Sequence, residues 1–259
     1  MLNFDDILSY YPKHLHVFKD NILKEYLQHK ILDILFSTKY SNQLVFLGGT
    51  SIRIIHNSTR FSEDLDFDNS GLNQSDFLHL ANTIQYRLSL EGYEVEIKNV
   101  IKTAAYHCYI KFPGLLYEQG LSGHKEEKIL IQLDAEPQKY EYLPEKYLLN
   151  KFGIFRYLTV TPLPLLLAQK ICACLCRKRT KGRDFFDVVF LSSKTTPDFA
   201  YLSNYANIRT KQDLVVRLKQ KASSLNLKIL AKDIEPFLFE PSQKDRVLHF
   251  VDWLDTLQG

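Results

Sequence analysis

The spacing of apolar residues predicts alternating helices and strands in the first part of the chain. From Phe18 to Phe36, apolar side chains recur at three- and four-residue steps, which is typical of a helix packed against a core. The apolar run Leu44–Leu47 ends at Gly48-Gly49 and predicts a buried strand followed by a turn. A short helix is expected over Thr50–His56. The alternation of acidic and apolar residues over Asp64–Phe67 predicts a second strand beside the first.

The middle of the chain has the character of a sheet, and the remainder that of helices. Ser75 is expected to cap a helix over Asp76–Leu90 that closes at Gly92. Runs rich in β-branched or aromatic residues predict further strands over Tyr93–Val100, Ala105–Phe112, Lys128–Asp134 and Phe155–Val160. From Pro162 to Trp253 the periodicity is helical. We therefore predict an α/β (α+β) fold, bilobed, in which a mixed-sheet domain with an N-terminal helix (residues 1–160) precedes an all-helical C-terminal domain (residues 161–259).

The charge of the chain is nearly balanced. Its 259 residues include 33 Lys and Arg against 30 Asp and Glu, so a wholesale basic tail is excluded while a local basic patch is not. The longest apolar stretches, such as Leu163–Ala168, are far shorter than the roughly 20 residues of a membrane span. The N-terminus has no basic region followed by an apolar signal core. We expect a cytoplasmic protein with no membrane partner.

Two acidic residues of the second expected strand are candidates for metal binding. Residues two apart on a strand share a face, so Asp64 and Asp66 project to the same side. Two such carboxylates repel each other, and a divalent cation relieves that repulsion. Mg²⁺ accepts one or two carboxylates together with substrate phosphates, so it is the expected cation, with Mn²⁺ as the alternative.

The glycine turn before this strand is suited to a phosphate. Gly48 and Gly49 lack a Cβ and let the backbone approach an anion closely, and the start of the following helix presents free N–H groups. Thr50 and Ser51 add hydroxyl groups there, and Ser62 is placed to donate a further hydrogen bond to a nucleotide. Either motif alone also describes a tight turn or a solvated edge strand. Together they predict a site for an NTP and its metal.

The combined segment FLGGTSIRIIHNSTRFSEDLDFD resembles a known signature. It is similar to that of polymerase-beta-type nucleotidyltransferases and, more narrowly, to that of the AbiEii-type (MenT-like) toxins, which share a GGT…RxSEDxDF pattern. The resemblance implies a third carboxylate on a neighbouring strand, and Asp134 fits that position. Glu136, expected on the opposite face, is the weaker candidate. An ordinary acid at a strand end is the alternative for Asp134.

One lysine stands inside the most apolar helix expected in the C-terminal half. Lys170 shares a helical stripe with Arg177, and burial of its ammonium group without a partner would be costly. A triphosphate would be that partner. The run K-x-x-A-x-x-x-R leading to R-D-x-x-D also resembles the AbiEii-type pattern, which implies that Lys170 contacts the nucleotide and that Asp184 or Asp187 orients the basic residues. A set of ion pairs at a helix start is the alternative for the two aspartates.

Basic residues are dense between Arg177 and Arg183. The cluster consists of Arg177, Lys178, Arg179, Lys181 and Arg183. It is placed to bind the phosphates of an RNA acceptor, an interaction that weakens as salt rises, and Arg177 is also within reach of the nucleotide. A solvated helix face is the alternative.

The predicted reaction is metal-dependent nucleotidyl transfer with release of pyrophosphate. Asp64 and Asp66 are expected to hold two Mg²⁺ ions, and Asp134 the one that activates the attacking hydroxyl. The resemblance implies the 3′ end of a tRNA as acceptor and a cognate antitoxin as partner in a toxin–antitoxin system. Two alternatives are transfer to an antibiotic or to a protein side chain, and a non-catalytic module that binds nucleotide or RNA.

Overall fold

The chain divides into two compact units, which we call the sheet unit and the helical unit. The computed structural model describes residues 2–103 and 105–257. The sheet unit comprises Met1–His56 and Phe61–Val160, and the helical unit comprises Asn57–Arg60 and Thr161–Gly259. The short segment Asn57–Arg60 therefore interrupts the sheet unit and belongs to the helical unit.

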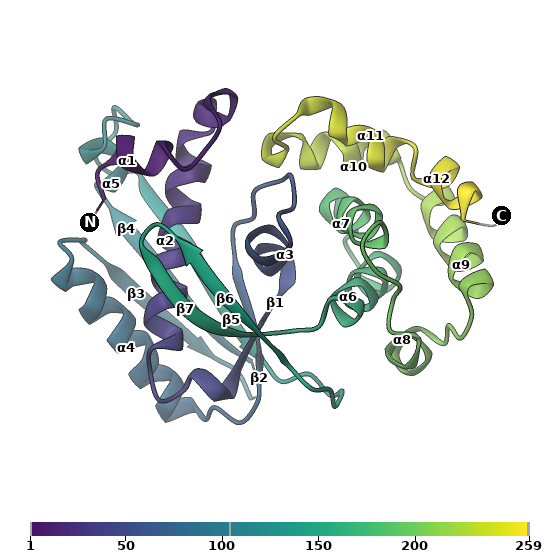
Figure 1. Ribbon diagram of the computed structural model, residues 1–259, viewed down its shortest axis with the longest axis horizontal. Helices are drawn as coiled ribbons and strands as arrows, with labels where there is room; N and C mark the ends of the chain where they lie inside the picture. The colour runs from purple at the N-terminus through teal and green to yellow at the C-terminus, as the bar shows by residue number, and fades with distance from the viewer. Residues whose placement is uncertain (1, 104, 258–259) are drawn as a thin grey trace. The chain divides into compact units, whose positions relative to one another are not determined.

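A seven-stranded mixed sheet forms the body of the sheet unit (Figure 1). Its strands are β1 Leu44–Leu47, β2 Leu65–Asn69, β3 Glu96–Ile101, β4 Tyr106–Pro113, β5 Lys128–Glu136, β6 Glu145–Lys151 and β7 Ile154–Val160. They lie in the order β3-β4-β5-β2-β1-β7-β6. The pairs β2–β5 and β1–β7 are parallel, and the other neighbours are antiparallel. The predicted mixed-sheet α/β fold is confirmed.

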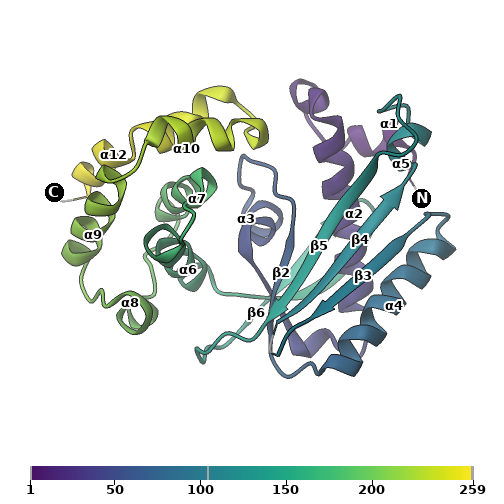
Figure 2. The same ribbon diagram turned by 180° about the vertical axis from the view of Figure 1, so that it is seen from behind.

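Two long helices cover one face of this sheet. The helices of the unit are α1 Phe4–Leu8, α2 Lys19–Phe36, α3 Gly48–His56, α4 Gln74–Leu90 and α5 Leu115–Glu118. The rings of Phe36 in α2 and Phe67 in β2 lie 6.3 Å apart, and those of Phe77 in α4 and Tyr106 in β4 lie 5.2 Å apart. Figure 2 shows β3, β4 and β5 in front of α2. The predicted helix from Phe18 to Phe36 is therefore a core helix of the unit.

Side chains of the sheet alternate between the face that α2 and α4 cover and the opposite face, which we call the open face. On β5, Ile129, Ile131 and Leu133 are buried, while the residues between them are partly or fully exposed. Strand β4 alternates in the same way. Because the period is two, Asp66 and Asp134 project from the open face.

Two expectations about single residues are wrong. Asn73, not Ser75, caps α4, and its side-chain oxygen accepts the N–H of Asp76 at 2.9 Å. Glu136 lies two residues after Asp134 and so shares the open face with it, rather than pointing to the opposite side.

Strand β6 is absent from the sequence expectation. It forms a hairpin with β7 whose turn contains Phe152 and Gly153, both with positive φ, at 57° and 74°. Glycine adopts such angles readily and phenylalanine rarely does. Gly153 is therefore the only one of these two residues whose type indicates a turn.

The helical unit packs its helices around aromatic side chains. Its helices are α6 Leu163–Cys176, α7 Gly182–Ser192, α8 Phe199–Ala206, α9 Lys211–Ser223, α10 Leu227–Ile234, α11 Asp245–Leu248 and α12 Phe250–Thr256. The rings of Phe185 and Phe250 lie 4.7 Å apart in the core. A Cβ at Gly182 would overlap the carbonyl group of Leu230, so α7 and α10 approach each other closely there. Among the described residues, no helix combines the length and apolar character needed to span a bilayer.

Candidate active site

Two of the predicted carboxylates lie side by side on adjacent strands. Strands β2 and β5 are parallel, and their register pairs Leu65 with Leu133 and Asp66 with Asp134. Neighbouring strands are about 4.8 Å apart, so the two aspartates are direct neighbours on the open face. Both are partly exposed. Asp64, directly before β2, belongs to the same alternation.

Gly48 lies against the carboxylate of Asp66. Leu47, the last residue of β1, pairs with Asp66 of β2, and the chain then enters α3 at Gly48 with a φ of 80°. A Cβ at Gly48 would overlap the Asp66 side chain. Both the positive φ and the close approach therefore require glycine. The first N–H groups of α3, which have no acceptor within the helix, begin beside this carboxylate.

Thr50 and Ser51 follow in the first turn of α3 and are both buried. The hydroxyl of Thr50 donates a hydrogen bond to the backbone carbonyl of Asp64. The hydroxyl of Ser51 has no hydrogen-bond partner among the described residues. Leaving such a buried group unsatisfied costs roughly 1–3 kcal/mol, which a ligand oxygen can offset. Ser51 thus fits a phosphate, whereas Thr50 holds the acidic segment in place.

A residue absent from the sequence expectation holds the loop before β2. Gln28, buried in α2, donates from Nε2 to the carbonyl groups of Ser62 and Glu63, each at 2.9 Å. The Thr50 hydroxyl of α3 donates to the next carbonyl, that of Asp64. Side chains of α2 and α3 therefore bind three successive backbone carbonyls. The backbone that leads into the acidic strand is therefore fixed from both helices.

Asp134 is oriented by two neighbours. Nε2 of Gln132 lies 2.9 Å and 2.8 Å from its two carboxylate oxygens, and Nδ1 of His107 lies 2.7 Å from Oδ1. A carboxylate only accepts, so Nδ1 of His107 carries the proton in this pair. Nε2 of the same ring is buried and has no partner among the described residues.

The donor set fits a hard divalent cation. Among the residues that the structure describes, no three His, Cys, Asp or Glu side chains form a closed metal site. Asp68, the second acid of β2, accepts hydrogen bonds from the N–H of Gln138 and the hydroxyl of Tyr142. An open Mg²⁺ site needs only one or two carboxylates and completes its shell with phosphates and water. Asp66 and Asp134 meet that requirement.

The remaining predicted residues gather in the helical unit. Nζ of Lys170 lies 2.9 Å from a carboxylate oxygen of Asp187 and 3.2 Å from one of Asp184. Arg177 pairs with Asp184 at 2.8 Å. Arg60, which is not among the predicted site residues, donates hydrogen bonds to both carboxylate oxygens of Asp187 at 2.7 Å and 2.6 Å. The two aspartates thus bridge three cations.

Burial and charge compete in this cluster. Burial alone would raise the pKa of Asp187. The charges of Arg60 and Lys170 lower that pKa by more than burial raises it, so the net pKa is below its ordinary value. Burial alone would lower the pKa of Lys170, but Asp187 and Asp184 raise it more, so the net pKa is above its ordinary value. Lys170 and Asp187 are therefore charged at neutral pH. With three cations against two carboxylates, the cluster carries excess positive charge.

The basic residues that follow Lys170 do not form a helix face. Helix α6 ends at Cys176, and Arg177 to Lys181 form the connection to α7. Lys178 and Arg179 are exposed on this loop. The alternative of a solvated helix face therefore does not describe Arg177 to Lys181, whereas Arg183 lies in α7 and is partly exposed.

A buried charge network in the sheet unit is also absent from the sequence expectation. Glu25 of α2 accepts from the hydroxyl of Tyr11 at 2.8 Å, from Arg53 at 2.7 Å and from Lys151 at 3.0 Å. Burial would raise the pKa of Glu25, but Arg53 and Lys151 lower it to about 2. Burial lowers the pKa of His29, which hydrogen-bonds the Glu25 carbonyl, to about 4. This network joins α2 to α3.

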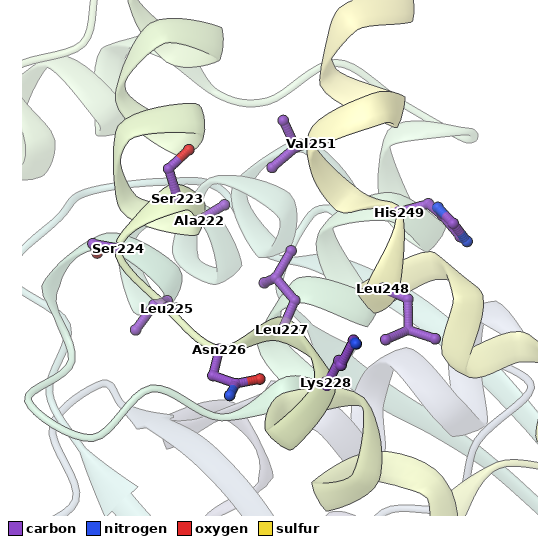
Figure 3. A pocket seen from close by; sticks show the side chains of 10 residues that line it. All are labelled: Ala222, Ser223, Ser224, Leu225, Asn226, Leu227, Lys228, Leu248, His249 and Val251. Atoms are coloured by element: carbon purple, nitrogen blue, oxygen red, sulfur yellow. The ribbon is translucent and has the colours of Figure 1, made fainter.

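The helical unit also carries a groove of about 820 Å³ (Figure 3). It is lined by residues 222–228 at the junction of α9 and α10 and by Leu248, His249 and Val251. None of the predicted site residues lines it.

Comparisons with known proteins agree with this reading of the fold. The chain resembles JHP933 from Helicobacter pylori, with a TM-score of 0.56 and 18% identity over 92% of this chain and 91% of that one. It also resembles a second H. pylori structure, described as a candidate nucleotidyltransferase, with a TM-score of 0.56 and 18% identity over 91% of this chain and 93% of that one. The comparison with curated proteins gave no match.

A family model matches most of the chain. The model describes the nucleotidyl transferase AbiEii toxin of type IV toxin–antitoxin systems, and it matches residues 30–252. This range contains the glycine turn, the acidic strand and the helix that bears Lys170. The resemblance seen in the sequence is confirmed, and the chain belongs to the AbiEii family of toxin nucleotidyltransferases.

Proposed function

We propose that this nucleotidyltransferase uses a divalent metal to move an NMP from an NTP to the 3′ end of a tRNA, and that a cognate antitoxin restrains it. The observation that carries the proposal is the register of Asp66 with Asp134 on parallel strands, with Gly48 against Asp66. Adjacent carboxylates beside a helix start can receive a metal and a triphosphate together.

In this proposal Asp64, Asp66 and Asp134 are the metal ligands, with Mg²⁺ as the metal and Mn²⁺ as the alternative. When bound, the metal would polarise the α-phosphate and lower the pKa of the attacking hydroxyl. The N–H groups of Gly49 and the residues after it would receive phosphate oxygens. The buried hydroxyl of Ser51 would donate to one of them.

The acceptor hydroxyl attacks the α-phosphorus in line, the bond to the bridging oxygen breaks, and pyrophosphate leaves. Lys170 and Arg177 are proposed contacts of the nucleotide phosphates, with Asp184 and Asp187 orienting them. Ser62 is a proposed further donor to the nucleotide. The exposed loop between α6 and α7 is a proposed contact of the tRNA backbone, in the segment 177–183.

The test is an incubation of the protein with each NTP labelled at the α-phosphate, Mg²⁺ and total tRNA. Label is expected in RNA, and it should be lost in Asp66→Asn. Label in protein or in a small molecule would contradict the tRNA acceptor. Nucleotide binding without transfer to any acceptor would contradict catalysis.

The toxin part of the proposal has a separate test in growing bacteria. Expression of the wild-type chain is expected to arrest growth, and Asp64→Ala is expected to relieve the arrest. Co-expression of the neighbouring gene should also relieve it if that gene encodes the antitoxin. Unimpaired growth with active wild-type protein would contradict a toxin.

A further inference from the structure

The open face of β4 carries a set of side chains that the proposed chemistry does not use. Cys108, Ile110 and Phe112 are buried against the core, so the residues that alternate with them project from the open face. These are His107, Tyr109 and Lys111, and all of them are partly exposed. In Figure 2 this part of the sheet lies in front of α2.

The register places this set directly beside the candidate metal ligands. Across the sheet, His107 pairs with Asp134, which pairs with Asp66. Tyr109 lies two residues after His107 on β4, on the same face. It pairs with Gln132 of β5 on one side and with Lys98 of β3 on the other. A continuous row of side chains therefore runs outward from the two aspartates toward the β3 edge.

The chemistry of the row suits a nucleic-acid strand. Lys98 is exposed, and neither Lys98 nor Lys111 forms an ion pair among the described residues. The nearby Lys128 is paired with Glu96 at 2.8 Å, so it is not equally available. The phenol ring of Tyr109 is partly exposed and offers a surface on which a base can stack.

We propose that Lys98, Tyr109 and Lys111, which we call the β4 row, bind the single-stranded 3′ end of the RNA acceptor. This inference rests on the proposed function, because it places the acceptor on the side of Asp134, the ligand proposed to serve the attacking hydroxyl. The two lysines contact backbone phosphates and Tyr109 stacks on a base. Charge complementarity selects the occupant, since two lysines without ion pairs among the described residues flank one aromatic ring on the open face. Glu96, which lies across from Lys111, is already paired with Lys128.

The test measures RNA binding separately from catalysis. Lys98→Gln/Lys111→Gln and Tyr109→Leu are compared with wild type, and Lys13→Gln/Lys39→Gln is the control because it removes two exposed lysines elsewhere in the sheet unit. Affinity for tRNA is measured across a salt series, together with KM for tRNA and for NTP. The Lys98/Lys111 variant should reduce the slope of log affinity against log salt by about 1.4, the value for two single-strand phosphate contacts.

The row variants are expected to raise KM for tRNA about tenfold with KM for NTP unchanged, since each variant loses a stacking or phosphate contact with the RNA. The control variant should match wild type, and thermal melting should confirm that each variant is folded. An unchanged salt slope and tRNA KM in folded row variants would overturn the β4 row while leaving the proposed function intact. If wild-type protein neither binds nor labels tRNA, both proposals fail together.

Discussion

Asp66 and Asp134 in the sheet unit and Asp184 and Asp187 in the helical unit are pairs of the same residue type in contrasting surroundings. The first pair is partly exposed, and Asp134 is held by a histidine and an amide. The second pair is fully buried and bridges three cations. Buried carboxylates that are already paired with cations cannot be removed singly without leaving a buried charge uncompensated. Adjacent carboxylates on an open face are instead suited to bind a cation from solution.

The largest expected effect is on catalysis, from the sheet pair. Asp66→Asn should lower kcat/KM for nucleotidyl transfer by about 10³-fold, since it removes charge at the reacting centre. Its melting temperature should stay near that of wild type, because the side chain is partly exposed and the change relieves repulsion with Asp134. If Asp66→Asn lowered stability as strongly as activity, Asp66 would have a structural role like that of Asp184 and Asp187, and the contrast between the two pairs would be wrong.

For the pair in the helical unit, Asp184 and Asp187, we expect a substitution to reduce stability more than it reduces catalysis. Asp187→Asn leaves Arg60 and Lys170 buried with less compensation, and removal of one partner of a buried ion pair costs about 3–5 kcal/mol. Urea unfolding followed by tryptophan fluorescence, using Trp253 in the same unit, would measure the loss. The control is Asp245→Asn, at an exposed acid of the same unit, and it should leave the unfolding midpoint unchanged. A shift in this control would mean that the unfolding signal does not report the buried cluster specifically.

A smaller effect on activity is expected from Gln28, and it should show whether this residue positions the acidic strand or only packs in the core. Gln28→Leu removes the donor to the Ser62 and Glu63 carbonyls, and loss of such a supporting contact typically costs 10–100-fold in activity or metal affinity. The matched control is Gln85→Leu, which removes a side-chain bond to the Val95 carbonyl far along the chain. The Gln28 variant should need more Mg²⁺ for half-maximal rate. Equal Mg²⁺ dependence in both variants would argue against a positioning role.

A further expected effect, which involves no substitution at the active site, is a dependence of stability on pH that comes from the buried Glu25 network. The pKa of Glu25 is lowered from 4.5 to about 2, so its contribution is present above pH 4.5 and is lost as the pH falls toward 2. The pKa of His29 is lowered from 6.5 to about 4, so its contribution is lost earlier, as the pH falls from 6.5 toward 4. Melting temperature measured from pH 7 to pH 3 should fall across both windows, and His29→Gln should flatten the upper one.

The parts of the site that were predictable from sequence are those set by short-range periodicity. The glycine turn and the alternating acids of β2 lie within a few residues of each other, and a period of two is enough to assign their face. Gln28 acts on carbonyls 34 and 35 positions away, and Arg60 on a carboxylate 127 positions away. No local pattern marks Gln28, and although Arg60 is the arginine of the RxSEDxDF pattern, that pattern does not indicate its partner, because packing alone brings the two groups together. Thr50 shows the same limit, since its hydroxyl is used by the Asp64 carbonyl.

The segment Asn57–Arg60 has a consequence for attempts to divide the protein. Its Thr59 carbonyl accepts the N–H of Phe239 at 3.0 Å, and its Arg60 binds Asp187, although the segment lies between two elements of the sheet unit. A polypeptide that stops after Val160 would carry a guanidinium group stripped of its carboxylate. The complementary fragment would hold Asp187 without its arginine, and it would lack the carbonyl of Thr59 that accepts the N–H of Phe239. We therefore expect that a cut after Val160 destabilises both halves, so mutations in the full-length chain are the practical route to assigning roles to each unit.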